Sequence, residues 1–293
     1  MKITAHCFAE NVNITPNSFL FKYKGYDVKI LSFEKQLLLQ LSKIADDQDK
    51  ENIKRSIGDN LEIKMMPYKL ILTEVAQVLE GLFAILYSSD SIPPKFDTSR
   101  INVNIVTETK EEKKLIADGI IYPSFGNVGK SPDTSSNYTM DDSIIPLIES
   151  SINHLPAFSF FAQATRSLHN NENEIAFFLF FRIIDGYFSD GAKDVEKALI
   201  KKAKDLETFL PYDEDLKKST KSILTEMQGT SKSENNYNGF ISDMVLIRHK
   251  LTHFSSTNAK KHHSAKIIFE LMTLNIYLHH ACALILRNKI NVE

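Results

Sequence analysis

The feature of this sequence that most constrains its fold is a change of hydrophobic pattern near residue 150. Before it, short runs rich in β-branched and aromatic residues are separated by turn-forming residues, which is typical of strands. After it, longer segments carry apolar residues at helical spacing. Because 293 residues exceed the usual size of one domain, we expect two domains, residues 1–150 and 151–293.

The first domain is predicted to be an α+β module. Its segment 70–88 is long and periodic enough for a helix that packs on a small sheet. Strands are expected at 2–9, 19–24, 26–33, 61–67 and 101–107. Residues 124–142 concentrate Gly, Ser, Asn, Asp and Pro, so they are predicted to form a loop or linker. Since no catalytic constellation is visible in 1–150, we interpret this module as a sensing or regulatory domain.

The second domain is predicted to be an all-α helical bundle, because each of its segments carries an apolar stripe that only neighbouring helices can cover. Turn-forming residues separate the segments. The expected helices span 156–169, 174–188, 195–208, 213–228, 240–254 and 260–288.

The charge balance limits the kinds of partner. A net charge of -2 argues against a strongly basic nucleic-acid binder, although an enzyme that touches a few phosphates remains possible. Lys and Arg minus Asp and Glu gives 17 minus 21, or -4, for residues 1–150, and 18 minus 16, or +2, for 151–293. The second domain is therefore the better candidate for contact with an anion.

Cysteine usage and hydropathy favour a cytoplasmic protein that makes no contact with a membrane. Cys7 and Cys282 are far apart in sequence and have no paired spacing, so neither a disulfide framework nor a thiolate metal site is expected. The first residues lack an apolar run of signal-peptide length. No stretch reaches the roughly 18 uninterrupted apolar residues of a membrane span.

The stretch Arg248-His-Lys-Leu-Thr-His253 lies late in the expected helix 240–254. At about 100° per residue, Arg248 falls about 80° from Phe240, at the edge of the apolar stripe, and His253 falls about 140° further round. On a straight helix the two side chains diverge. They converge only if the helix ends or bends near His253, or if a second copy of the chain supplies its own pair. The stripe itself consists of Phe240, Met244, Ile247, Leu251 and Phe254.

This motif resembles the signature of the HEPN superfamily of helical ribonucleases, in which an Arg is followed by a polar residue and, after four to six residues, by a His. His249 is the polar residue here. The sequence also looks like the ApeA-like branch of anti-phage defence. Members carry an acidic residue on an early, very apolar helix, and Asp185 matches it. The resemblance covers residues 151–293 and says nothing of 1–150.

The resemblance implies metal-independent RNA cleavage without a cofactor, through attack of a ribose 2′-OH on the adjacent phosphorus. Arg248 would hold the phosphate, His253 would transfer the proton, and His249 would support them. It also implies a homodimer in which two motifs build one cleft. A defence or toxin-like role follows, with a phage or cellular trigger bound by residues 1–150. The RNA, whether tRNA, rRNA or mRNA, stays open, as does the alternative of a catalytically silent HEPN-like module for dimerisation or partner binding.

The carboxylate of Asp185 needs a partner, because the helix around it is apolar on nearly every face. One interpretation is an ion pair with Arg182, three residues earlier on the same face. The other is that Asp185 reaches Arg248 or His253 and fixes its orientation. Both could hold together as one network.

Two further clusters have weaker claims to function. Lys260 and Lys261 open the last expected helix and could bind RNA phosphates, although a charged run is usually a solvated helix face. His279 and His280 are adjacent, so they lack the four-residue spacing of a helical metal pair. This spacing argues against a metal-dependent hydrolase, and no metal site is predicted.

Overall fold

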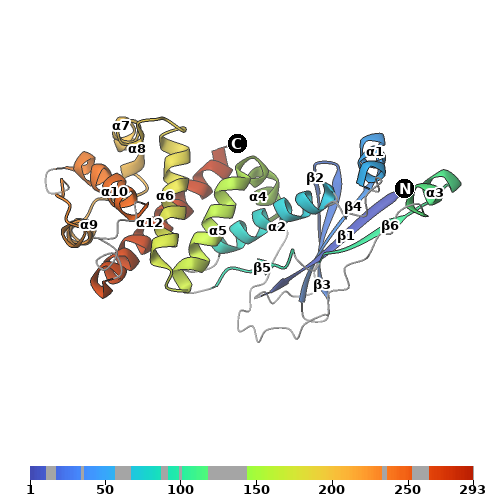
Figure 1. Ribbon diagram of the computed structural model, residues 1–293, viewed down its shortest axis with the longest axis horizontal. Helices are drawn as coiled ribbons and strands as arrows, with labels where there is room; N and C mark the ends of the chain where they lie inside the picture. The colour runs from blue at the N-terminus through green and yellow to red at the C-terminus, as the bar shows by residue number, and fades with distance from the viewer. Residues whose placement is uncertain are drawn as a thin grey trace. The chain divides into compact units, whose positions relative to one another are not determined.

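The computed structural model describes residues 1–10, 18–33, 36–56, 67–86, 92–98, 101–117, 144–232, 236–252 and 264–292. The chain divides into two compact units (Figure 1). The first comprises Met1–Phe83 and Pro94–Leu155, and the second comprises Ala84–Pro93 and Pro156–Glu293. The first unit combines strands with helices and the second is helical, which confirms the predicted order of an α+β part followed by an all-α part. The predicted linker 124–142 lies outside the described residues.

An antiparallel sheet forms the centre of the first unit. Strand β1 (Lys2–Glu10) lies between β4 (Gln36–Ile44) on one side and two short strands on the other. These are β6 (Asn102–Val106), which pairs with the first half of β1, and β5 (Lys95–Phe96), which pairs with its end. Beyond β4 follow β3 (Tyr26–Phe33) and β2 (Phe19–Tyr23). The sequence pattern predicts no element at 36–44, so β4 is a strand that the pattern does not reveal.

The sheet buries one face, as the alternation of side chains along its strands requires. In β1 the odd-numbered residues are buried, and in β2 burial alternates strictly along the strand. The two-residue turn between β2 and β3 consists of Lys24 and Gly25, whose φ angles are 45° and 81°. Such a turn matches the twist of paired strands, and glycine adopts it without a steric penalty.

Helix α2 (Pro67–Leu86) is attached to the sheet at two points. The Tyr23 hydroxyl donates to Oε2 of Glu74 at 3.0 Å, and the Phe96 backbone N–H donates to Oε1 of the buried Glu80 at 2.9 Å. Except for Pro67, which begins α2, the predicted strand at 61–67 lies outside the described residues. The helix predicted at 70–88 is present as α2 over its described part.

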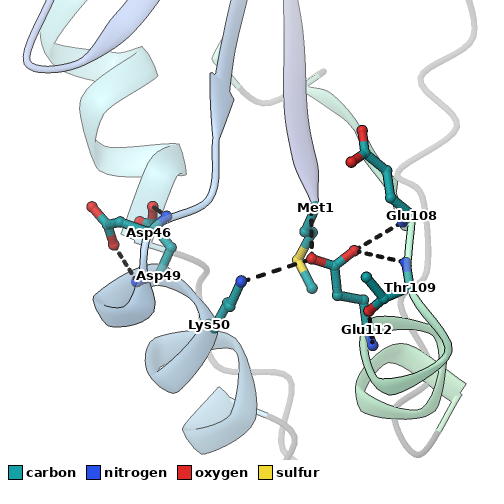
Figure 2. Close-up of polar contacts among 7 residues, drawn as sticks. All are labelled: Met1, Asp46, Asp49, Lys50, Glu108, Thr109 and Glu112. Carbon is teal, nitrogen blue, oxygen red and sulfur yellow. Dashed lines mark hydrogen bonds and ion pairs between the residues drawn. The ribbon is translucent and has the colours of Figure 1, made fainter.

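Two short helices of the first unit begin with capping boxes, shown in Figure 2. In α1 (Asp47–Ser56), Asp46 and Asp49 each accept a hydrogen bond from the backbone N–H of the other. In α3 (Lys110–Ala117), the Glu112 N–H donates to the Thr109 hydroxyl, and the Glu112 carboxylate accepts the Thr109 N–H. These reciprocal bonds satisfy N–H groups that the first turn of a helix leaves unpaired.

The Glu112 carboxylate also binds the chain's α-ammonium group. The Met1 nitrogen donates to Oε1 at 2.7 Å, and the Lys50 ammonium lies 3.7 Å from the same oxygen (Figure 2). The hydrogen bond from the α-ammonium, followed by those from the backbone N–H groups of Glu108 and Thr109, lowers the pKa of Glu112 to about 2. A helix α4 (Ile144–Ser151) and a 3₁₀ turn (Ile152–His154) complete this unit.

The second unit is built around two long helices, α6 (Asn173–Phe188) and α12 (Ala265–Val292), which pack on each other. Helix α9 (Glu214–Glu226) packs on α12, and α10 (Tyr237–Thr252) packs on α9, α7 and α6. Helices α5 (Leu155–His169), α6 and α9 lie where helices were predicted. The prediction of one helix at 195–208 is wrong, because the chain breaks at Lys202 into α7 (Val195–Lys201) and α8 (Ala203–Glu207).

Helix α12 is long and apolar enough to cross a membrane by length and composition alone. Half of its most apolar part is buried inside the unit, and its leucines at 271, 274 and 278 are fully buried. These residues recur at helical spacing, as in the core helix of a bundle.

Candidate functional site

Arg248 lies on α10 beside the residues that anchor this helix in the bundle. Phe240, Met244 and Ile247 are fully buried, as the apolar stripe predicts. Leu251 is half-buried, and Phe254 lies outside the described residues. Arg248 follows Ile247 directly and therefore emerges at the border of the core, with 37% of its side chain exposed. A guanidinium in this position can be held by the bundle and still meet a ligand from solvent.

Asp185 on α6 is the acidic partner of Arg248. Oδ2 of Asp185 lies 3.7 Å from Nη1 of Arg248, and 26% of the Asp185 side chain is exposed. At this distance the two groups form an ion pair but no hydrogen bond. The N–H groups of the guanidinium make no hydrogen bond to any residue that the structure describes. A guanidinium carries five N–H donors, which suit an anion.

The aromatic ring of Phe181 supports the same guanidinium. The central carbon of the Arg248 guanidinium lies 5.2 Å from the ring centroid, within the range of a cation–π interaction. Phe181 is itself buried and packs on Phe177, with ring centroids 6.0 Å apart. The guanidinium therefore contacts an aromatic ring that cannot move away easily.

Ser189 fixes the other oxygen of Asp185. Its hydroxyl donates to Oδ1 of the carboxylate, and it also lies 2.8 Å from the main-chain oxygen of Asp185. Ser189 is the residue at which α6 ends, and it is buried. Oδ1 of Asp185 thus accepts a hydrogen bond from Ser189 at the end of α6, while Oδ2 faces Arg248 on α10.

The structure distinguishes the two partners considered for Asp185. The Arg182 guanidinium lies 4.8 Å from the centroid of the Phe160 ring on α5. Among the described residues, the ion pair of Asp185 is with Arg248. The interpretation that Arg182 pairs with Asp185 within the helix is therefore wrong. No ion pair or hydrogen bond between Arg182 and Asp185, both of which the structure describes, supports the expected role of Arg182 in the site.

Of the remaining predicted site residues, the structure describes His249 alone. His253, Lys260 and Lys261 lie outside the described residues. Helix α10 is described up to Thr252, the residue before His253, and the Thr252 hydroxyl bonds to the carbonyl oxygens of Arg248 and His249. His249 is exposed on α10. Its side chain is thus accessible at the surface next to Arg248.

Polar contacts also hold the first half of α10 in place. The buried Asp243 carboxylate accepts hydrogen bonds from the Ser231 hydroxyl at 2.6 Å and from the Lys232 backbone N–H at 2.8 Å. The neighbouring Ser242 hydroxyl donates to Glu196 of α7 at 2.6 Å. These bonds fix α10 to the preceding loop and to α7, so Arg248 projects from an anchored helix.

The histidines of α12 take the roles of packing and surface residues. His279 is buried, stacks on Phe161 at 5.1 Å and meets the edge of Phe180 at 5.8 Å. Burial lowers the pKa of His279 to about 4, so this imidazole is neutral at pH 7. His280 is exposed. Within the described ranges, no three His, Cys, Asp or Glu side chains gather where they could hold a metal ion.

The arrangement gathers a solvent-accessible guanidinium, a carboxylate and an aromatic ring at the α6–α10 contact. It suits the binding of a phosphate, because a planar guanidinium matches phosphate oxygens with paired donors. Phe181 and Ser189 are not among the predicted site residues, although their four-residue spacing from Asp185 places all three on one face of α6. Comparison of the chain with models of protein families, with curated proteins and with solved structures finds no match.

Proposed function

We propose that the second unit is a metal-independent endoribonuclease of the HEPN type, in which Arg248 binds the scissile phosphate and His253 transfers the proton of the ribose 2′-OH. The observation that supports it is the anchored yet accessible Arg248 guanidinium, which Asp185 and Phe181 contact from α6. The late position of Arg248 on α10 supports it as well, because His253 follows the last described residue of that helix.

The chemistry needs only side chains of this chain. The 2′-oxygen attacks the adjacent phosphorus while its proton passes to the imidazole of His253, and the 5′-oxygen of the next nucleotide departs and takes up a proton from water. An imidazole with an ordinary pKa near 6.5 suits proton transfer at neutral pH. The guanidinium stabilises the negative charge on the phosphate oxygens. The first product carries a 2′,3′-cyclic phosphate end, which addition of water opens to a 3′-phosphate, and DNA is inert because it lacks the 2′-OH.

The experiment is to incubate the purified chain with tRNA or total RNA in excess EDTA and to identify the ends of the products. We expect cleavage with cyclic or 3′-phosphate ends. Loss of cleavage on addition of EDTA would instead indicate a metal-dependent hydrolase. An RNA in which the cleaved nucleotide carries a 2′-deoxyribose should resist the enzyme, and cutting at that nucleotide would contradict the mechanism.

A second candidate is a catalytically silent helical module for dimerisation or partner binding. The ion pair of Arg248 with Asp185 favours it, since a purely structural arginine would also take an acidic partner. The two candidates differ in one outcome. A silent module leaves RNA intact under every condition, whereas the nuclease cleaves it and loses this activity with His253→Ala.

We further propose that the chain acts as a homodimer, in line with the HEPN resemblance. Exposed apolar side chains on α12 support this, since Phe269 and Ile276 are 63% and 51% exposed and lie seven residues apart on one helix face. Sedimentation of the wild-type chain should give the mass of two chains, and Phe269→Glu should give the mass of one. A wild-type monomer at micromolar concentration would contradict the dimer.

The cellular role is proposed from the same resemblance. A nuclease of cellular RNA must be restrained until it is needed, which fits cytoplasmic anti-phage defence or a toxin-like effector. The first unit would then bind the trigger. Expression in bacteria should slow growth with the wild-type chain but not with His253→Ala, and equal growth would contradict the toxin-like role.

A further inference from the structure

We propose that Phe181 and Ser189 are positioning residues for the Arg248 guanidinium, which they hold directly and through Asp185. This inference rests on the proposed function for its meaning in RNA cleavage, but not for its geometry. Phe181, Asp185 and Ser189 are spaced by four residues on α6. Residues with this spacing lie one above the other on a helix, so the three form one continuous row.

The row meets Arg248 from two directions. Phe181 offers its ring to the guanidinium, with 5.2 Å between the guanidinium carbon and the ring centroid. Asp185 offers Oδ2 at 3.7 Å from Nη1. A ring contact restrains the position of the guanidinium carbon but leaves rotation about the ring normal, whereas a carboxylate beside one nitrogen selects a rotation. Together the two contacts restrain both.

The carboxylate can select a rotation only if it is itself held, and Ser189 supplies that restraint. The Ser189 hydroxyl has one proton and two acceptors in reach, the main-chain oxygen of Asp185 at 2.8 Å and Oδ1 of its carboxylate. The main-chain oxygen already accepts the Ser189 N–H at 2.9 Å. The ionised carboxylate is the stronger acceptor. We therefore infer that the Ser189 hydroxyl donates its hydrogen bond to Oδ1, which leaves Oδ2 facing Arg248 on α10.

Ser189 is more deeply buried than Asp185 and Arg248, the two residues that it helps to hold. Ser189 is 5% exposed, while Asp185 and Arg248 are each more than a quarter exposed. Water competes weakly for a buried hydroxyl, so the bond to Asp185 persists while the outer pair meets solvent and ligand. The partly exposed ion pair alone is too weakly restrained to fix a guanidinium, since ion pairs that water reaches contribute little.

The first test measures the order of the Arg248 side chain by ¹⁵N relaxation at its Nε in the full chain without RNA. We expect lower order in Ser189→Ala, in Phe181→Leu and in Asp185→Ala. Ser189→Thr keeps the hydroxyl and should retain the order. The control is Thr225→Ala in α9, which loses the same kind of hydroxyl bond to a carbonyl four residues earlier but has no carboxylate in it. Unchanged order of Arg248 in Ser189→Ala would overturn the role of Ser189, and unchanged order in Phe181→Leu would overturn that of Phe181.

The second test measures RNA cleavage by the same variants. We expect Ser189→Ala to lower kcat about tenfold with a smaller change in KM. The positive charge of Arg248 remains in this variant, but its guanidinium is no longer held in one orientation. Ser189→Thr should restore kcat, which a loss of packing alone would not predict. A wild-type kcat in Ser189→Ala would overturn the inference for cleavage. If the wild-type chain cleaves no RNA, the proposed function fails, and the relaxation measurement alone decides whether these residues position Arg248.

Discussion

Oδ2 of Asp185 on α6 lies 3.7 Å from Nη1 of Arg248 on α10, so one ion pair joins two helices that are distant in sequence. This pair connects the apolar helix α6 with the helix that precedes His253. It gives the Asp185 carboxylate a partner, which burial beside the core requires. Because the pair reaches the surface, it also leaves the guanidinium accessible to a phosphate.

Arg248→Lys should abolish most cleavage while leaving the fold intact. A lysine ammonium lacks the planar fork of donors and lies less well on the Phe181 ring, so we expect a loss of about 100-fold in kcat/KM. The free energy of unfolding should change by less than about 1 kcal/mol, since the ion pair is partly exposed. Cleavage kinetics and urea denaturation measure the two effects. The control is Arg287→Lys on α12, where the guanidinium donates to the main-chain oxygen of Ile85 at 2.7 Å and, within the described part of the chain, makes no contact with Asp185 or Phe181. Equal activity of both variants would remove Arg248 from the mechanism.

Asp243→Ala should destabilise the second unit by about 2–4 kcal/mol, because the Ser231 hydroxyl and the Lys232 N–H lose a buried carboxylate acceptor. Asp243→Asn keeps one acceptor oxygen and should cost less. Urea denaturation of both variants measures the free energy of unfolding. A loss under about 0.5 kcal/mol in Asp243→Ala would show that these bonds do not hold α10.

His279 should make the chain less stable in mild acid. Its folded pKa of about 4 lies below its ordinary value of 6.5, so the unfolded chain takes up the proton first as the pH falls. The stability due to neutral His279 is therefore complete above pH 6.5 and is lost between pH 6.5 and about 4. The loss is on the order of 3 kcal/mol.

The variant that tests this is His279→Phe, which keeps a ring against Phe161 and has no proton to gain. Its unfolding free energy should depend less on pH in this window than that of the wild type. His280→Phe, one residue further along α12 and exposed in the wild type, should keep the wild-type slope. Parallel pH profiles for the wild type and His279→Phe would show that His279 does not cause the acid sensitivity.

Glu112→Gln should destabilise the first unit at neutral pH, because the capping box and the α-ammonium lose a charged acceptor. The folded pKa of Glu112, about 2, lies below its ordinary value of 4.5. Its contribution is therefore present above pH 4.5 and disappears as the pH falls through about 2. Thermal unfolding should show a gap between variant and wild type at pH 7 that closes near pH 2. The exposed neighbour Glu111→Gln is the control, and an equal effect of both variants would contradict the assignment.

The sequence predicted the order of an α+β part and a helical part because period-two and helical apolar patterns are local properties. It missed β4, whose Leu37-Leu38-Leu39 run has no visible alternation and whose residues favour helices as much as strands. The register opposite β1 and β3, which the sequence does not reveal, makes this run a strand. The break at Lys202 was missed for a similar reason, since no glycine or proline marks it.

In the site, the sequence identified Asp185 because a carboxylate in so apolar a helix needs a partner, and Arg248 by its motif. It could not choose between Arg182 and Arg248 as that partner. The choice depends on which face of α6 meets α10 and which meets α5, and this is a property of tertiary packing. Phe181 is one of several phenylalanines in this apolar helix, and Ser189 follows the end of the expected helix 174–188, so the sequence singled out neither residue.

The central claim is that His253 performs proton transfer at a phosphate held by Arg248, and the cleavage of one end-labelled RNA in excess EDTA tests it most directly. The wild-type chain, His253→Ala and the surface control His280→Ala are compared at equal concentration, each shown to be folded by circular dichroism. We predict cleavage by the wild type and by His280→Ala, and a loss of at least about 100-fold in His253→Ala. Cleavage by His253→Ala at the wild-type rate, or intact RNA with all three proteins, would contradict the account.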